Sequence, residues 1–276
     1  MRAFAQLYTE LDETTATNEK VAALVRYFRS VPAADAAWAV HFLIGRRPKR
    51  LVRAGDLRTW AADAAAIPEW LFEESYHAVG DLAETIALLL PEQEEEAKDS
   101  ASLSQWVEER LLPLRELEPA EQRRVMLDAW QELGGRERYV WNKLITGAFR
   151  VGASQRLVIR ALAEVSGVAD EVIAHRLMGA WNPDPAFFAR LVAAETRDAD
   201  RSRPYPFCLA YPLEQPPEVL GEIAAWQAEW KWDGIRAQLV RRGGSTWLWS
   251  RGEDLLTGRF PEVELASALL PDGTVI

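Results

Sequence analysis

The chain has 276 residues, of which 49% are apolar, and a formal net charge of −10 at pH 7. This is an ordinary globular composition, long enough for two domains with buried cores. The single cysteine, Cys208, excludes an intrachain disulfide, and no run of about 18 apolar residues that could cross a membrane occurs. The first residues lack the basic and apolar regions of a signal peptide, so we expect a cytoplasmic protein without a membrane partner.

The negative net charge argues against a nucleic-acid partner, because phosphate binding depends chiefly on Lys and Arg. The basic residues are clustered, however. Five of them fall within eight positions that contain no acid: Arg46, Arg47, Lys49, Arg50 and Arg53. Six more stand against the single acid Glu137: Arg136, Arg138, Lys143, Arg150, Arg156 and Arg160. Two interpretations stay open for these clusters, namely contact with DNA and solvated helix faces.

From residue 3 to about 200 the apolar residues recur at intervals of three and four, which is typical of packed amphipathic helices. Gly45 is expected to end one helix and Pro68 to open another, and Gly134 with Gly135 ends a third. We therefore predict an all-helical domain over residues 1–203. Its tryptophans at helical spacing are predicted to be core residues: Trp38, Trp60, Trp70, Trp106 and Trp130.

The pattern changes at residues 201–206, where Pro204 and Pro206 prevent helix continuation and favour an extended linker. Beyond it, residues 226–232 and 234–242 alternate with period two, and Gly243-Gly244 separates the second run from residues 245–250. Such a pattern predicts an antiparallel hairpin. The fold class is thus multidomain, α followed by α+β, with a second domain over residues 204–276 that opens with antiparallel sheet.

Residues 229–236 contain the candidate catalytic residues. If this segment is a strand, Glu229, Lys231 and Asp233 share one face, opposite two tryptophans. Placing a lysine between carboxylates on such a face costs free energy if the face is shielded from water, and the arrangement serves no function if the face is fully exposed. We therefore expect the face to line a cleft. A lysine in a cleft can act as a nucleophile. Position alone favours the alternative, an extended surface lysine on a strand that pairs with Asp233.

This segment resembles the Lys-x-Asp-Gly-x-Arg motif that DNA ligases, RNA ligases and mRNA capping enzymes share. Lys231, Asp233, Gly234 and Arg236 occupy its fixed positions. A second block, residues 250–253 followed by residues 257–261, resembles the next ligase motif after the lysine. Two such motifs in the right order and spacing make coincidence very unlikely. The resemblance therefore identifies the second domain as the beginning of an antiparallel-sheet nucleotidyltransferase domain of the ATP-grasp-like ligase type.

The resemblance implies that Lys231 attacks the α-phosphate of ATP, releases pyrophosphate and holds AMP through a phosphoramide bond. AMP then passes to the 5′-phosphate of a nick, and the 3′-hydroxyl displaces it and seals the strand. ATP and Mg²⁺ are the implied cofactors. Glu229 is expected to bind the adenine amino group, and Arg236 and Arg251 the ribose and phosphates. The implied supporting residues are Asp233, Gly234 and Glu253.

Two stretches of the helical half, residues 78–84 and 143–152, resemble the DNA-binding domain that precedes the catalytic core in archaeal, eukaryotic and some bacterial DNA ligases. In that family the domain holds duplex DNA across the minor groove, mainly through the DNA backbone. Nicked duplex DNA is the implied partner. The implied contact residues are Arg46, Arg47, Arg50, Lys143, Thr146, Gly147, Arg150, Gly152 and Ser154. Ser154 is equally expected to be the N-cap of the following helix.

The family pattern continues beyond Ile276 into acidic, glutamate and lysine motifs and an oligonucleotide-binding fold. We therefore expect no metal site within this chain, the remainder of the ligase as a further partner, and neither nick sealing nor self-adenylation by the 276-residue chain alone. Two alternatives stay open. One is a lysine nucleotidyltransferase that acts on RNA, and the other is a non-catalytic helical DNA-binding module.

Overall fold

The computed structural model describes residues 1–48, 51–91, 101–147, 152–194, 202–207, 212–227, 229–230, 232–252 and 254–276. Four predicted site residues lie outside these ranges: Arg50, Arg150, Lys231 and Glu253. The chain divides into two compact units. We call Met1–Asp170 with Asn182–Ala194 the helical unit, and Glu171–Trp181 with Glu195–Ile276 the hairpin unit. The predicted domain boundary between residues 203 and 204 stays a prediction.

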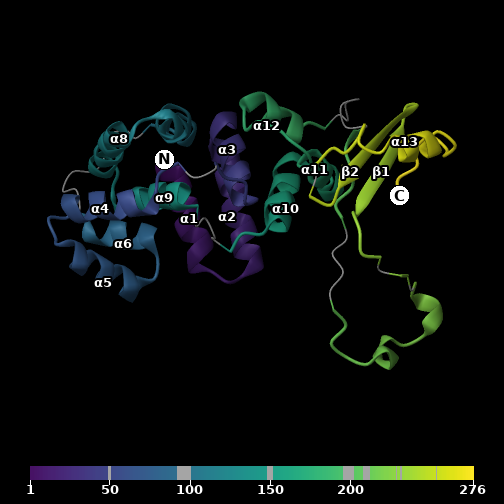
Figure 1. Cartoon of the computed structure of the whole chain (residues 1–276), viewed down its shortest axis with the longest axis horizontal. Helices are drawn as coiled ribbons and strands as arrows, with labels where there is room; N and C mark the ends of the chain where they lie inside the picture. The colour runs from purple at the N-terminus through teal and green to yellow at the C-terminus, as the bar shows by residue number, and fades with distance from the viewer. Residues whose placement is uncertain are drawn as a thin grey trace. The chain divides into compact units, whose positions relative to one another are not determined.

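The helical unit is a bundle of short helices (Figure 1). In its described part these are α1 (Arg2–Glu13), α2 (Thr17–Ser30), α3 (Ala33–Leu43), α4 (Ala54–Ala64), α5 (Glu69–Val79), α6 (Leu82–Leu89), α7 (Leu103–Gln105), α8 (Pro119–Glu132), α9 (Gly135–Thr146), α10 (Gln155–Ser166) and α12 (Pro185–Leu191). A π-helical turn, η1 (Trp106–Leu111), and a 3-10 turn, η2 (Leu112–Glu116), follow α7. Among these described residues, no helix has the length and apolar run needed to cross a membrane.

Local capping residues set the ends of several helices. Asp81 precedes α6 and accepts a hydrogen bond from the Glu84 amide at 3.0 Å. Asp184 precedes α12 and accepts one from the Phe187 amide at 2.6 Å. As predicted, Pro68 opens α5, and α3 ends just before Gly45, whose φ of 86° is a conformation that glycine adopts without strain.

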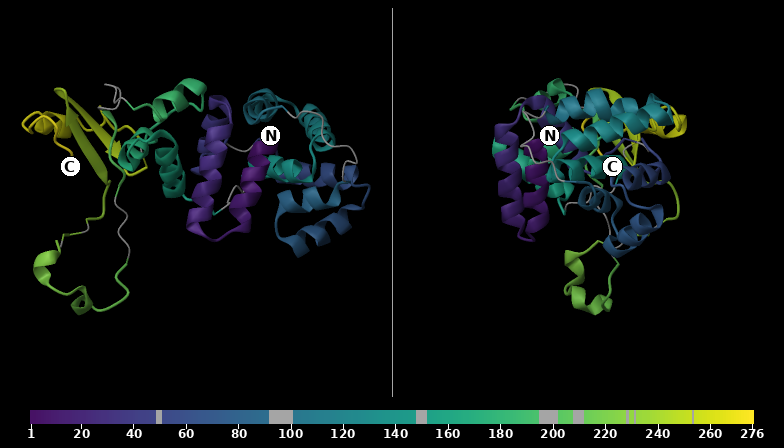
Figure 2. Two further views of the ribbon diagram at one scale, coloured as in Figure 1. Left: turned by 180° about the vertical axis from the view of Figure 1, so that it is seen from behind. Right: turned by 90° about the vertical axis from the view of Figure 1, so that its left-hand side faces the viewer.

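Two groups of helices build the core of the helical unit. α2 packs against α1 and α10, and α9 packs against α6 and α1, as two views show (Figures 1 and 2). Four of the predicted core tryptophans are buried: Trp38, Trp60, Trp106 and Trp130. The prediction for Trp70 is wrong, since this side chain is 66% exposed. Phe72 is the one buried residue described for α5, so α5 lies at the surface and its spacing points Trp70 outward.

The hairpin unit contains the predicted antiparallel hairpin. β1 (Ala237–Arg242) pairs with β2 (Ser245–Ser250), in a register that sets Ala237 opposite Ser250 and Arg242 opposite Ser245. Gly243 and Gly244, with φ of 58° and 75°, form the two-residue turn. Helix α13 (Pro261–Ser267) follows, and Phe260 and Val263 pack against a small core of Leu239, Leu248 and Leu256. Other helical elements described for this unit are α11 (Asp170–Arg176), η4 (Pro217–Leu220) and η5 (Ile223–Ala225).

The predicted alternating strand over residues 226–232 is wrong for its described residues. These belong to no strand, and Trp230 and Trp232 are 86% and 79% exposed. β1 is hydrogen-bonded to β2 on one edge, and Leu239 on its other edge exchanges backbone hydrogen bonds with Ile276. Among the described residues, no strand is paired with residues 226–235. An alternating pattern forms a strand only where a neighbour takes up its backbone hydrogen bonds.

Candidate nucleotide and DNA sites

An open hollow of about 680 Å³ in the hairpin unit joins the two predicted motifs. Its lining consists of Trp232, Asp233, Gly234, Arg236, Ser250, Arg251 and Gly252. The hairpin register explains this meeting. Arg236 directly precedes β1, Arg251 directly follows β2, and the strand ends pair with each other. The Arg251 amide also donates to the Arg236 carbonyl oxygen at 3.1 Å, so the main chain fixes the two arginines as neighbours.

Ser250 organises the second motif. Its hydroxyl oxygen accepts hydrogen bonds from the Gly252 and Asp254 amides, both at 3.1 Å. The Ser250 amide in turn donates to the Asp254 carbonyl oxygen at 2.8 Å. These three bonds close a tight turn that carries Arg251 at the rim of the hollow.

The hollow combines the groups that a nucleotide requires. Its volume is within the usual range for small-molecule sites, about 300–1,000 Å³. The guanidinium groups of Arg236 and Arg251 can bind phosphate or ribose oxygens, and the indole of Trp232 offers an apolar surface. Among the described lining residues, Asp233 supplies a carboxylate. The described residues contain no group of three or more His, Cys, Asp or Glu side chains placed to hold a metal ion.

Glu229 stands apart from this set. It is exposed, it does not line the hollow, and its carboxylate accepts a hydrogen bond from Gln227 Nε2 at 2.5 Å. Lys231 and Glu253 lie outside the described residues. The structure thus brings together Asp233, Gly234, Arg236 and Arg251 of the predicted nucleotide site.

The predicted DNA-contact residues of the helical unit occupy two kinds of environment. Arg47 is exposed and donates to the Gly147 carbonyl oxygen, whereas Arg46 is half-buried. Gly152 is also exposed, and its carbonyl oxygen accepts a hydrogen bond from Lys20 Nζ at 3.0 Å. Lys20 was not predicted, because no local pattern links it to a residue 132 positions away.

Lys143 is an interior residue. It is only 6% exposed, its Nζ lies 2.5 Å from Asp81 Oδ2, and it approaches the Tyr139 ring at 5.1 Å. Burial opposes both charges, but the hydrogen bond within the pair prevails, so the pKa of Asp81 is lowered and the pKa of Lys143 is raised. This environment does not favour contact between Lys143 and a DNA phosphate.

The hydroxyl groups of Thr146 and Ser154 differ in their hydrogen bonding. The Thr146 hydroxyl donates to the Asn142 carbonyl oxygen at 2.9 Å, within α9. Ser154 occupies the predicted N-cap position of α10, but its side chain makes no capping hydrogen bond. Its exposed hydroxyl is therefore not committed to the helix.

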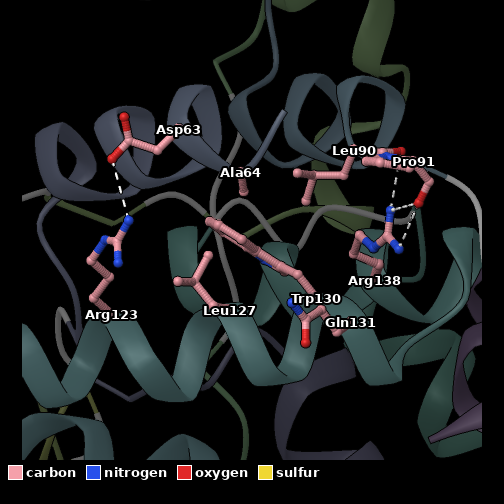
Figure 3. Close-up of a pocket in the computed structure, with 9 residues that line it drawn as sticks. All are labelled: Asp63, Ala64, Leu90, Pro91, Arg123, Leu127, Trp130, Gln131 and Arg138. Atoms are coloured by element: carbon pink, nitrogen blue, oxygen red, sulfur yellow. Dashed lines mark hydrogen bonds and ion pairs between the residues drawn. The ribbon is translucent and has the colours of Figure 1, made fainter. Parts of the chain in front are cut away.

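A second pocket, of about 560 Å³, lies between α4, α8, α9 and the end of α6 (Figure 3). Arg123 faces Asp63 across it at 3.4 Å, and Trp130 lies along its floor. Arg138 is buried and donates to the Leu90 and Pro91 carbonyl oxygens at 3.3 and 3.1 Å, which ties α9 to the end of α6. None of the predicted site residues that the structure describes lines this pocket.

The comparisons with known proteins show the family of the chain. Residues 1–163 match the family model described as DNA ligase N terminus. The chain is 26% identical to a probable DNA ligase from Koribacter versatilis, over 95% of this chain and 47% of the relative. It is 26% identical to a probable DNA ligase from Streptomyces coelicolor, over 97% of this chain and 48% of the relative. It is 23% identical to a DNA ligase from Hyperthermus butylicus, over 94% of this chain and 48% of the relative. The chain thus spans about half the length of these curated relatives. Because the family model covers more than half of its residues, the chain belongs to the DNA ligase N-terminus family.

Proposed function

We propose that this chain is the DNA-binding and nucleotide-capturing part of an ATP-dependent DNA ligase. A helical DNA-binding domain over residues 1–203 leads into the first part of a nucleotidyltransferase domain over residues 204–276. The observation that carries the proposal is the hollow that Arg236 and Arg251 share with Asp233. The proposed DNA binding is supported by the match of residues 1–163 to the DNA ligase N terminus family.

Lys231 is the proposed nucleophile. The lone pair of its deprotonated amine attacks the α-phosphorus of ATP, a phosphorus–nitrogen bond forms, and the bond to pyrophosphate breaks. The 5′-phosphate of the nick then takes over the adenylyl group and the phosphorus–nitrogen bond breaks. Finally the 3′-hydroxyl attacks the 5′-phosphate and AMP leaves. Arg236 and Arg251 neutralise phosphate charge during these steps, and Gly234 lets the main chain approach the nucleotide.

ATP fits the groups that line the hollow, since two guanidinium groups match phosphate oxygens and Trp232 offers a surface for an apolar ring. Glu229 is proposed to reach the adenine amino group and Glu253 to support the site. Mg²⁺, when bound, screens the phosphate charge, and it is typically held by one or two carboxylates together with substrate phosphates. Asp233 is the carboxylate of the lining that could contribute.

Nicked duplex DNA is the proposed substrate of the helical unit. Its proposed contacts are Arg46, Arg47, Arg50, Thr146, Gly147, Arg150, Gly152 and Ser154, which combine cations with hydroxyl and main-chain donors. Lys143 is proposed instead to hold α9 against α6, because it is buried and paired with Asp81.

Nucleotide binding tests the hollow directly. We expect titration calorimetry to detect ATP binding to the 276-residue chain, and expect Arg236→Ala and Arg251→Ala each to weaken it about tenfold, the effect of one lost charge-assisted phosphate contact. Arg242→Ala is the matched control, because Arg242 lies at the other end of β1 from Arg236, belongs to neither motif and does not line the hollow. Equal weakening by all three substitutions would reject the assigned site.

A further inference from the structure

The link between α9 and α10 is held at both ends. Gly147 follows the last residue of α9, and Gly152 lies three residues before α10 begins. Both glycines have left-handed backbone conformations, with φ of 71° and 64°. L-residues with side chains rarely adopt this conformation, so the two positions set the direction in which the chain leaves α9 and enters α10.

The carbonyl oxygen of each of these glycines accepts a hydrogen bond from a basic side chain. Arg47, from the segment after α3, donates through Nη1 to the Gly147 oxygen, and Lys20, from the first turn of α2, donates through Nζ to the Gly152 oxygen at 3.0 Å. The cations approach closely because the glycines lack side chains. A Cβ atom added at Gly147 would lie 2.8 Å from Arg47 Nη1, and one at Gly152 would lie 2.5 Å from Lys20 Nζ.

The anchor at Lys20 belongs to a packed interface. α2 packs along α10, and Arg160 of α10 donates through Nη2 to Asn18 Oδ1 of α2 at 3.1 Å. The start of α2 and the middle of α10 are therefore joined by a side-chain hydrogen bond as well as by packing. A hydrogen bond from Lys20 to Gly152 then fixes the link to a helix that is itself held in place.

We propose that Lys20 and Arg47 are positioning residues for DNA binding, which hold the main chain at Gly152 and at Gly147 in the arrangement that engages the DNA backbone. This inference rests on the proposed function, since it takes the helical unit as the DNA-binding part. A surface that is already ordered loses less conformational entropy when it binds. Removing Lys20 therefore weakens DNA binding even though Lys20 is not among the proposed DNA contacts, whereas removing Arg47 removes a proposed contact as well as an anchor.

The test compares the loss of a positive charge with the loss of a hydrogen bond to a glycine carbonyl oxygen. Lys20→Met and Arg47→Met each remove a cation and its hydrogen bond to a glycine carbonyl. Lys20→Arg keeps both the charge and a donor. Arg29→Met removes a cation from the last turn of the same helix α2, where Arg29 is exposed. The probe is a short synthetic DNA duplex with one nick that carries a 5′-phosphate, titrated into the full 276-residue chain.

We expect Lys20→Met and Arg47→Met to weaken binding about tenfold, and Lys20→Arg and Arg29→Met to bind within about twofold of the unmodified chain. Hydrogen exchange without DNA supplies a second readout for Arg47: the Gly147 amide, which donates to the Lys143 carbonyl oxygen, exchanges faster in Arg47→Met but not in Arg29→Met. Unchanged affinity in Lys20→Met, or equal weakening by Arg29→Met, would overturn the inference. If the unmodified chain does not bind the nicked duplex, the proposed function itself fails.

Discussion

Lys143 Nζ lies 2.5 Å from Asp81 Oδ2, and this ion pair joins α9 to the residue that caps α6. The other carboxylate oxygen of Asp81 accepts a hydrogen bond from the Glu84 amide at 3.0 Å. One carboxylate thus begins a helix and holds a second helix against it. α6 and α9 form one of the main helix contacts of the unit, so the pair supports the core of the helical unit.

Breaking this pair should destabilise the helical unit. We expect Lys143→Met and Asp81→Asn each to lower the free energy of unfolding by about 2 kcal/mol, less than for a fully buried pair because Asp81 is partly exposed. The double variant should lose less than the sum, because both substitutions remove the same interaction. Urea unfolding measures all three. Arg26→Met, which breaks an exposed pair with Glu10, is the control and should cost under about 1 kcal/mol. Strict additivity in the double variant would argue against the pairing.

His41 should make stability depend on pH. Burial, followed by the charge of Arg46, lowers the pKa of His41 from 6.5 to about 4. Between these values the unfolded chain binds a proton that the folded chain does not, so stability is complete above pH 6.5 and declines as the pH falls toward 4. His41→Gln should flatten the profile in this window. Urea unfolding at several pH values checks it, and an equally steep profile in the variant would show that another group titrates.

The salt dependence of DNA binding should separate surface cations from the interior lysine. If Arg46 and Arg50 contact phosphates, Arg46→Gln and Arg50→Gln should each reduce the slope of log K against log salt by about 0.9. Lys143→Met should leave the slope unchanged, since Lys143 is buried and paired. Fluorescence titrations of nicked duplex at several salt concentrations measure these slopes. A reduced slope in Lys143→Met would contradict its assignment as an interior residue.

Local signals in the sequence predicted the hairpin and most helix ends. Gly243-Gly244 between two alternating runs specifies a tight turn, and its register places Arg236 beside Arg251 without further information. Contacts between distant segments were not predictable in this way. Lys143 pairs with Asp81, which lies 62 positions away, and a motif resemblance cannot indicate that the lysine is buried.

Other errors arose because patterns do not identify neighbours. Helical spacing shows that Trp70 shares a face with other residues of α5, but not whether that face meets the core or solvent. Alternation over residues 226–232 suggested a strand, yet among the described residues no partner strand runs beside them. Lys20 is a similar case, since its contact with Gly152 depends on the packing of α2 against α10.

Covalent labelling tests the central claim, that Lys231 captures AMP, most directly. Because the relatives are about twice as long, the chain is joined to the C-terminal half of the Koribacter versatilis probable DNA ligase and incubated with ATP labelled in the α-phosphate and Mg²⁺. We expect acid-labile label on the joined protein, none in its Lys231→Ala variant, and little on the 276-residue chain alone. Label that persists in Lys231→Ala, or no label on a joined protein that is folded and binds nicked DNA, would contradict the account.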